Sequence, residues 1–166
     1  MHNTIYDIIL ISETWLNDTI TNGLVLNGCD NYSIIRNDRH NMTRGGGVCA
    51  IYNSKFKCCV INLPQEFLDQ EILCFDIHFN KYKHRYIVLY RPPNASVEFT
   101  NNMFACLEKL CDVSYLYTIC GDFNLPHVNW CKLASNGVPA AEVCLVNFVT
   151  QNGLHQLIHS PTHNSS

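Results

Sequence analysis

The chain has 166 residues, of which 47% are hydrophobic, and a formal net charge of −3 at pH 7. This length and composition are typical of one globular domain and exclude an intrinsically disordered chain. The negative charge excludes a protein that grips nucleic acid by bulk electrostatics, because that attraction scales with the number of phosphates neutralised by lysine and arginine. We therefore expect one domain over residues 1–166, in which any phosphate recognition is local.

The predicted strands and helices follow from the periodicity of apolar residues. Strand patterns cover residues 5–12, 31–38, 48–53, 56–63, 71–79, 85–90 and 115–121, with a further candidate at 154–158. The first is apolar enough for a strand covered on both faces, 48–53 and 56–63 are interpreted as adjacent strands, and 71–79 and 85–90 as a hairpin. Ser96 is a plausible cap for a helix whose apolar residues recur up to Cys111, and a second helix is predicted from Pro139 to Asn152, with Gly153 as its stop. These elements predict an α/β fold of the α+β type, with two packed sheets of mixed strand direction and helices outside.

Membrane insertion and secretion are not expected. The longest apolar run near the amino terminus, Ile8–Ile11, is far too short to span a bilayer. No basic segment precedes an apolar stretch, as a secretory signal would require. We expect an intracellular protein, nuclear or cytoplasmic, without a membrane partner or an obligate protein partner.

Ten cysteines raise the question of disulfides or a metal site. Four lie inside apolar runs, where a free thiol behaves as a small hydrophobe: Cys49, Cys74, Cys120 and Cys144. Without a secretory signal we expect reduced, buried cysteines. A zinc site would have to join Cys120 with His127 and Cys131, and it lacks the second closely spaced pair that structural zinc sites use.

Two basic clusters could contact phosphate locally. The first comprises Arg36, Arg39, His40 and Arg44, and the second Lys81, Lys83, His84 and Arg85. Solvated turns are the alternative for both. For the second cluster we favour a turn, because "NKYKHR" lies between two strand-like runs.

Polar side chains end three of the apolar strand patterns. Glu13 follows "IILIS", Tyr90 closes "YIVLY", and Asp122 follows "YTIC". Since side chains alternate along a strand, Asp122 and Asn124 would face one cleft while Phe123 anchors the core. Such groups from several strand ends can build a site on a rigid scaffold, although Asp and Asn at strand ends also commonly cap turns.

Four motifs occur in an order that resembles a known family. They are "SETWL" at 12–16, "RGGGVCAIY" at 44–52, "YRPPN" at 90–94 and "GDFNLPHVNW" at 121–130, followed by "SPTH" at 160–163. The sequence resembles the exonuclease-endonuclease-phosphatase family, and its motifs are most similar to those of the endonuclease domain of non-LTR retrotransposons. That domain is itself similar to abasic-site endonucleases and pancreatic deoxyribonuclease.

The resemblance implies a four-layer αββα sandwich that hydrolyses phosphodiester bonds of DNA with Mg²⁺, or with Mn²⁺ in its place. Carried over to this sequence, it implies that Glu13 binds the metal and that Tyr90, Asp122 and Asn124 are catalytic. Arg44 and Asn94 fall in loops that border the substrate cleft in relatives, and a surface role is the alternative for Arg44.

The sequence also departs from the family pattern. Relatives have an asparagine on an earlier strand and an Asp-His motif near the end, and neither is present here, so we expect a domain that is incomplete at both termini. Three readings stay open: a retrotransposon-derived DNA-nicking endonuclease, weakened or inactive; a phosphatase or small-molecule phosphodiesterase of the same fold; and a non-catalytic remnant or binding module. Whether the chain is an enzyme is left undecided.

Overall fold

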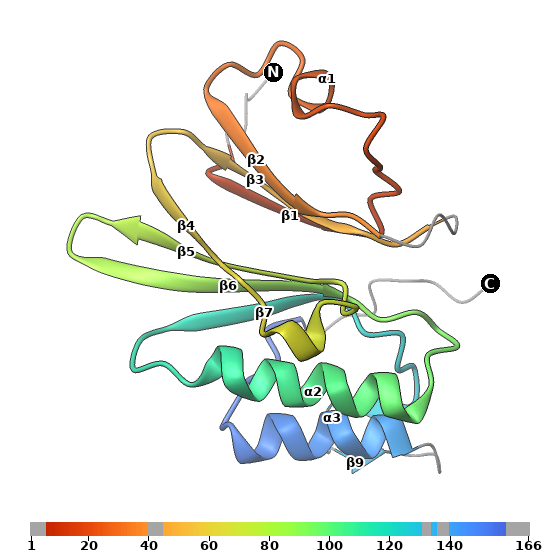
Figure 1. Cartoon of the computed structure of the whole chain (residues 1–166). Helices are drawn as coiled ribbons and strands as arrows, with labels where there is room; N and C mark the ends of the chain where they lie inside the picture. The colour runs from red at the N-terminus through yellow and green to blue at the C-terminus, as the bar shows by residue number, and fades with distance from the viewer. Residues whose placement is uncertain (1–5, 40–44, 131–133, 136–139, 159–166) are drawn as a thin grey trace.

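The computed structural model describes residues 6–39, 45–130, 134–135 and 140–158. Two β-sheets are stacked face to face, and two long helices cover the outer face of one of them (Figure 1). The first sheet has the strand order β1-β3-β2, from β1 (Ile8–Ser12), β3 (Val48–Asn53) and β2 (Tyr32–Asn37), and all its pairs are antiparallel. This agrees with the expected α+β sandwich of two packed sheets flanked by helices.

The second sheet is mixed. Its order is β4-β5-β6-β7, from β4 (Lys57–Ile61), β5 (Ile72–Phe79), β6 (Tyr82–Tyr90) and β7 (Tyr117–Asp122). Only β6 and β7 pair in parallel, because helix α2 (Val97–Cys111) connects them across the outer face. A two-stranded sheet of β8 (Val128–Asn129) and β9 (Ala134–Ser135) was not expected from the sequence.

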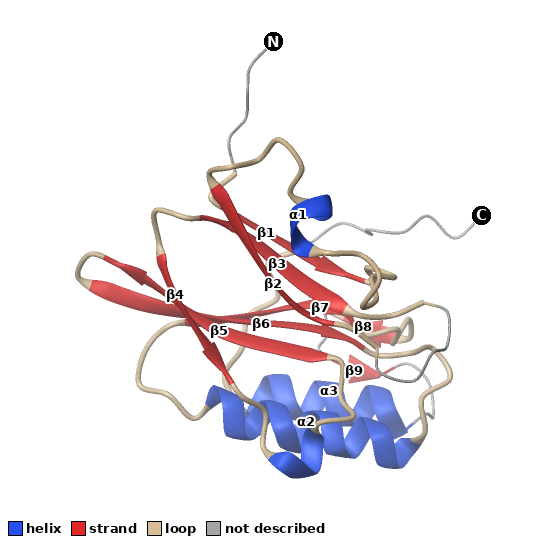
Figure 2. Cartoon of the chain, turned by 45° about the horizontal axis from the view of Figure 1, so that its top comes forward, coloured by secondary structure: helices blue, strands red, loops and turns tan. Residues whose placement is uncertain are grey.

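The helices lie mainly on one side of the molecule. Helix α2 and helix α3 (Ala140–Gln151) pack side by side below the second sheet, as Figure 2 shows. The 3-10 turn η1 (Gln65–Phe67) contacts α2. On the opposite side, the described residues contribute only the short helix α1 (Asn22–Val25). No helix among the described residues is long and apolar enough to cross a membrane.

Local signals for the long helices are confirmed. The Ser96 side chain accepts a hydrogen bond from the backbone N–H of Phe99 at 3.0 Å, which is the geometry of an N-cap. Helix α3 ends at Gln151, and Gly153 follows with a φ of 59°. The backbone N–H of Leu154 then donates to the carbonyl of Val149 at 2.9 Å, which satisfies a carbonyl at the end of the helix.

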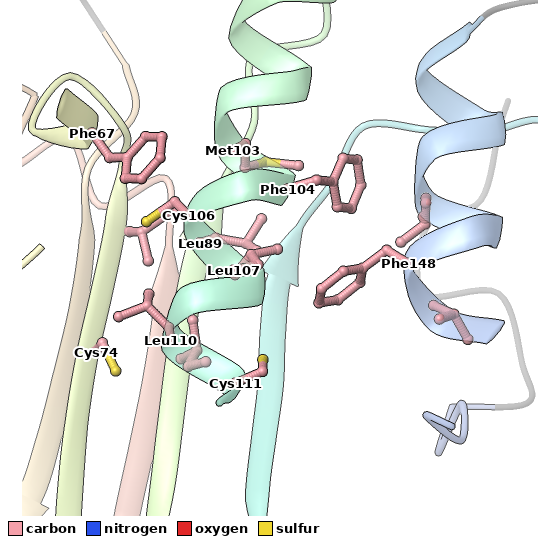
Figure 3. Packing of buried hydrophobic residues seen from close by; sticks show 14 of the residues in the cluster. Phe67, Cys74, Leu89, Met103, Phe104, Cys106, Leu107, Leu110, Cys111 and Phe148 are labelled. Atoms are coloured by element: carbon pink, nitrogen blue, oxygen red, sulfur yellow. The ribbon is translucent and has the colours of Figure 1, made fainter. Parts of the chain in front are cut away.

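The main hydrophobic core lies between the second sheet and the two long helices. Figure 3 shows its side chains converging from both layers, among them Phe67, Leu89, Phe104, Leu107 and Phe148. A second cluster fills the space between the two sheets, around Val48, Phe75, Val88 and Tyr90. The second sheet is therefore buried on both faces and provides the rigid layer on which the strand ends are positioned.

Several strand predictions need correction. Strand β1 is not covered on both faces: Ile8 and Leu10 pack toward the second sheet, whereas Ile9 and Ile11 are 37% and 38% exposed on the other face. Strands β3 and β4 are not neighbours, since the chain passes from one sheet to the other between them. Residues 154–158 form no strand.

The second basic cluster is not a solvated turn. The turn contains only Asn80 and Lys81, and the rest of the cluster belongs to β6. Arg85 is 8% exposed and donates from Nε to Oδ1 of Asp76 at 2.8 Å and from an NH group to the carbonyl of Leu110 at 2.9 Å. Tyr115 also donates to Asp76, at 2.7 Å. The arginine therefore joins the sheet to the end of helix α2.

The nine cysteines that the structure describes are all free thiols. Cys49 and Cys74 are buried as expected, whereas Cys120 and Cys144 are only partly buried. Cys131, a member of the zinc alternative, lies outside the described residues.

Candidate active site

Glu13 is positioned by a pairing that continues beyond the end of strand β1. The backbone N–H groups of Thr14 and Trp15 donate to the carbonyls of Gly47 and Gly46, at 3.1 and 2.9 Å. Glu13 itself is exposed and has a φ of 57°. An L-residue adopts this conformation at a cost of about 1–2 kcal/mol, so the surrounding loop must hold it in place.

Tyr90 joins the two sheets at this end of the sandwich. It is the last residue of β6, is only 6% exposed, and its hydroxyl donates to Oε1 of Glu13 at 3.2 Å. Burial, and then the negative charge of Glu13, raise the pKa of the Tyr90 phenol above its ordinary value. The phenol therefore keeps its proton at neutral pH and remains a hydrogen-bond donor.

Asp122 lies beside Tyr90 because their strands are parallel and in register. The last residues of β6 and β7 are paired, and the backbone N–H of Arg91 donates to the carbonyl of Asp122 at 2.8 Å. Oδ1 of Asp122 accepts from the backbone N–H of Asn124 at 3.0 Å, which fixes the carboxylate. Phe123 turns the other way and packs against the helix-side core, as expected.

The prediction that Asn124 shares the orientation of Asp122 through the alternation of side chains along one strand is wrong, because Asn124 lies beyond the strand. Strand β7 ends at Asp122, and Asn124 has a φ of 48° in the loop that follows. Its side-chain Nδ2 donates to the carbonyl of Arg91 at 2.8 Å, so part of the amide is used to join two loops. Glu13, Tyr90, Asp122 and Asn124 nevertheless form one contiguous group at the end of the sandwich.

An ion pair next to Tyr90 was not predicted from the sequence. Glu71 is 8% exposed, and its Oε1 accepts from Nε of Arg39 at 2.8 Å. Its other oxygen accepts from the backbone N–H of Gly47, and the Arg39 guanidinium lies 5.5 Å from the centre of the Tyr90 ring. The position of Glu71 directly before an apolar strand is the same kind of signal that identified Glu13.

Gly46 has to be a glycine for this ion pair to exist. Its φ is 74°, and a Cβ at this position would come within 2.4 Å of both the Arg39 guanidinium and the Glu71 carboxylate. Because both partners are largely buried, neither can move aside easily. The segment from Gly45 to Gly47 is thus shaped around the Arg39–Glu71 pair, which in turn contacts Tyr90.

Arg91 is a second buried charge that the sequence reasoning did not single out. It is 4% exposed, and its guanidinium donates to Oγ1 of Thr100 at 3.0 Å and to the carbonyls of Ala95 and Asn124, both at 3.3 Å. Burial lowers its pKa below the ordinary value, and the carboxylate of Glu142 in helix α3 acts in the opposite direction. Arg91 connects the loop after β6 with the loop after β7. The sequence signal that could have identified Arg91 is its position directly after the apolar strand that Tyr90 closes.

The structure describes one of the two cleft residues carried over from the family. Asn94 is exposed in the turn between β6 and helix α2. Arg44 lies outside the described residues.

The carboxylates near Tyr90 provide only part of the ligand set that a hard cation such as Mg²⁺ requires. Among the described residues, no group of three His, Cys, Asp or Glu side chains could hold a metal ion. Glu13 does present an exposed carboxylate with one oxygen oriented by Tyr90. One carboxylate fits Mg²⁺, which usually takes one or two together with waters and substrate phosphate.

Comparison with known proteins identifies a matching sequence family and solved structures of similar fold. The sequence model of the family described as endonuclease-reverse transcriptase matches residues 84–166, which is half of the chain. No curated protein matches the sequence. The matched segment includes Tyr90, Asp122 and Asn124.

Three solved structures are similar in fold. The endonuclease domain of TRAS1, a telomere-specific non-LTR retrotransposon, has a TM-score of 0.65 and 16% identity over 93% of this chain and 63% of that chain. The 3′ phosphatase NExo from Neisseria, bound to a product DNA hairpin, has a TM-score of 0.59 and 14% identity over 89% and 62%. An AP endonuclease from Archaeoglobus fulgidus has a TM-score of 0.58 and 16% identity over 87% and 60%. The chain thus spans less than two thirds of each.

Proposed function

The chain belongs to the endonuclease-reverse transcriptase family, and on that premise we propose that it hydrolyses phosphodiester bonds of DNA with Mg²⁺ or Mn²⁺. The observation that supports this most directly is the contiguity of the four polar residues. Glu13 and Tyr90 are 77 positions apart in sequence and share a hydrogen bond, and Asp122 is the in-register neighbour of Tyr90. The TRAS1 domain, an endonuclease, and the AP endonuclease share the fold.

Each residue has a distinct role in this proposal. Glu13 would hold the metal, which when bound supplies positive charge against the charge that develops on the phosphate. Asp122, fixed by the N–H of Asn124, orients an attacking water and accepts its proton. With substrate bound, Tyr90 would redirect its single phenolic proton from Glu13 toward the phosphate, and the second N–H of the Asn124 amide would contribute a further donor. Asn94 and Arg44 would contact the DNA beside the cleft.

The test is a nicking assay on supercoiled plasmid with Mg²⁺. Asp122→Ala should lower the rate of nicking by at least about 10²-fold, because general-base catalysis contributes about 10²- to 10⁴-fold. Asp30→Ala is the matched control, since Asp30 is exposed and precedes β2 at the end of the first sheet opposite Glu13. Equal nicking by the wild type and Asp122→Ala would refute the proposal.

A phosphatase is the second candidate, because the NExo structure of similar TM-score is a 3′ phosphatase. Release of inorganic phosphate from a 3′-phosphorylated oligonucleotide, lost in Asp122→Ala and without plasmid nicking, would favour it. Neither activity, from a chain that is folded by circular dichroism, would favour the non-catalytic reading.

A further inference from the structure

An exposed aromatic side chain stands next to Glu13. Trp15 is 49% exposed, although a ring of this size is usually largely buried. It has a φ of 58°, and its backbone N–H is held by the carbonyl of Gly46 at 2.9 Å. Two non-glycine residues of the same loop, Glu13 and Trp15, therefore adopt the left-handed conformation, which for a bulky residue is a genuine exception.

The indole of Trp15, the carboxylate of Glu13 and the largely buried guanidinium of Arg39 all lie near Gly45. Measured from the position that a Cβ on Gly45 would occupy, Nε1 of Trp15 lies at 3.7 Å, Oε1 of Glu13 at 3.9 Å and an NH group of Arg39 at 3.9 Å. Tyr90 is adjacent, since it donates to the same Glu13 oxygen and lies beneath the Arg39 guanidinium. The half-exposed ring thus borders the candidate active site.

Strained backbone conformations persist where the surrounding structure enforces them, and they concentrate at ligand-binding and catalytic positions. An exposed aromatic ring is a group that binds single-stranded nucleic acid, because every base has a face on which an aromatic ring can stack. The net charge of −3 makes such a contact more important, since bulk electrostatics cannot supply the affinity.

We propose that the indole of Trp15 stacks on an unpaired base of the DNA, next to the phosphodiester that lies at Glu13 and Tyr90. This inference rests on the proposed function for the location of the phosphate. It adds a substrate class: DNA in which a base beside the scissile bond is unstacked, as in a single strand, a gap or a frayed end. Fully paired duplex offers no such base and should bind more weakly.

Tryptophan fluorescence tests the contact without any catalysis. The sequence has two tryptophans, so Trp130→Phe leaves Trp15 as the single reporter. In EDTA, a single-stranded oligodeoxynucleotide should quench this emission in a saturable way, and a duplex of the same sequence should require a higher concentration. Unchanged emission at saturating single strand, with binding shown by anisotropy of a labelled oligonucleotide, would overturn the proposal.

Substitutions separate binding from folding. Stacking on one base is worth about 5- to 150-fold in affinity, so Trp15→Gly should weaken single-strand binding by that factor, and Trp15→Phe should recover most of it. Glycine accepts a φ of 58° without strain, which offsets part of the loss of the contacts of the half-buried ring, so the urea midpoint of Trp15→Gly should fall only slightly. A lower midpoint with unchanged affinity would show a structural role and refute the inference.

The proposal and the proposed function fail in different ways. Quenching that depends on Trp15, in a protein that does not nick plasmid, would support the base contact and contradict the nuclease. Nicking that is lost in Asp122→Ala, with a KM for a single-stranded substrate that Trp15→Gly leaves unchanged, would support the nuclease and contradict the base contact.

Discussion

Gly121 pairs with Leu89 of the parallel neighbour β6, and an alanine at this position should be severely destabilising. Its φ is 135°, and an added Cβ would lie 1.9 Å from the carbonyl oxygen of Leu89 and 2.8 Å from its carbonyl carbon. Both are backbone atoms of strand β6, so no side chain can rotate away. Glycine at this position therefore lets strand β6 approach β7 closely. The Leu89–Gly121 pair directly precedes the Tyr90–Asp122 pair in the β6–β7 register.

The magnitude follows from three contributions. Real Cβ contacts are essentially never shorter than 3.0 Å, so β7 would have to move away from β6 by more than about 1 Å. The left-handed backbone costs about 1–2 kcal/mol for an L-residue, overpacking costs about 1–3 kcal/mol, and each weakened ladder hydrogen bond costs about 1 kcal/mol. We expect Gly121→Ala to lower the free energy of unfolding by about 4 kcal/mol, a large part of the stability of a typical domain.

Urea unfolding followed by circular dichroism measures this change, and the chain supplies a matched control. Gly153 also has a positive φ, of 59°, but no atom lies within 4 Å of its added Cβ. Gly153→Ala should therefore show the backbone cost alone, about 1 kcal/mol. If Gly121→Ala loses no more stability than Gly153→Ala, the steric argument for the β6–β7 contact is wrong.

Two further predictions concern buried ionisable groups. Burial raises the pKa of Asp76, but the hydrogen bonds from Arg85 and Tyr115 outweigh this effect and hold the pKa below its ordinary value. The ionised Asp76 therefore stabilises the fold at pH values above the pKa of the unfolded state. Asp76→Asn should cost about 3 kcal/mol at pH 7, and the gap to the wild type in urea melts should shrink as the pH falls below about 4; a gap independent of pH would contradict this. Burial raises the pKa of Cys74 and of Cys106 to about 12, so at pH 8 an alkylating reagent should modify the exposed Cys29 in the folded protein and leave these two unmodified. Peptide mass spectrometry checks the sites, and early alkylation of Cys106 would contradict the burial.

The sequence by itself determined the elements and the residues at their ends. Apolar periodicity located the strands of both sheets, Ser96 and Gly153 marked helix boundaries, and Glu13, Tyr90 and Asp122 were identified as polar groups that terminate apolar runs. These signals are readable because they depend on interactions between residues close in the chain, which set the 2- and 3.6-residue periods and the caps.

Only the tertiary structure decided which groups meet. The parallel pairing of β6 with β7 puts Tyr90 beside Asp122, and the stacking of the two sheets brings Glu13 to Tyr90. The Arg39–Glu71 pair joins residues 32 positions apart, and no local pattern specifies its partner. The same holds for Arg91, whose contacts with two loops exist only once helix α2 and strand β7 are in place. Local chemistry fixes how each segment folds, whereas sheet stacking and burial select the partners of its charged side chains.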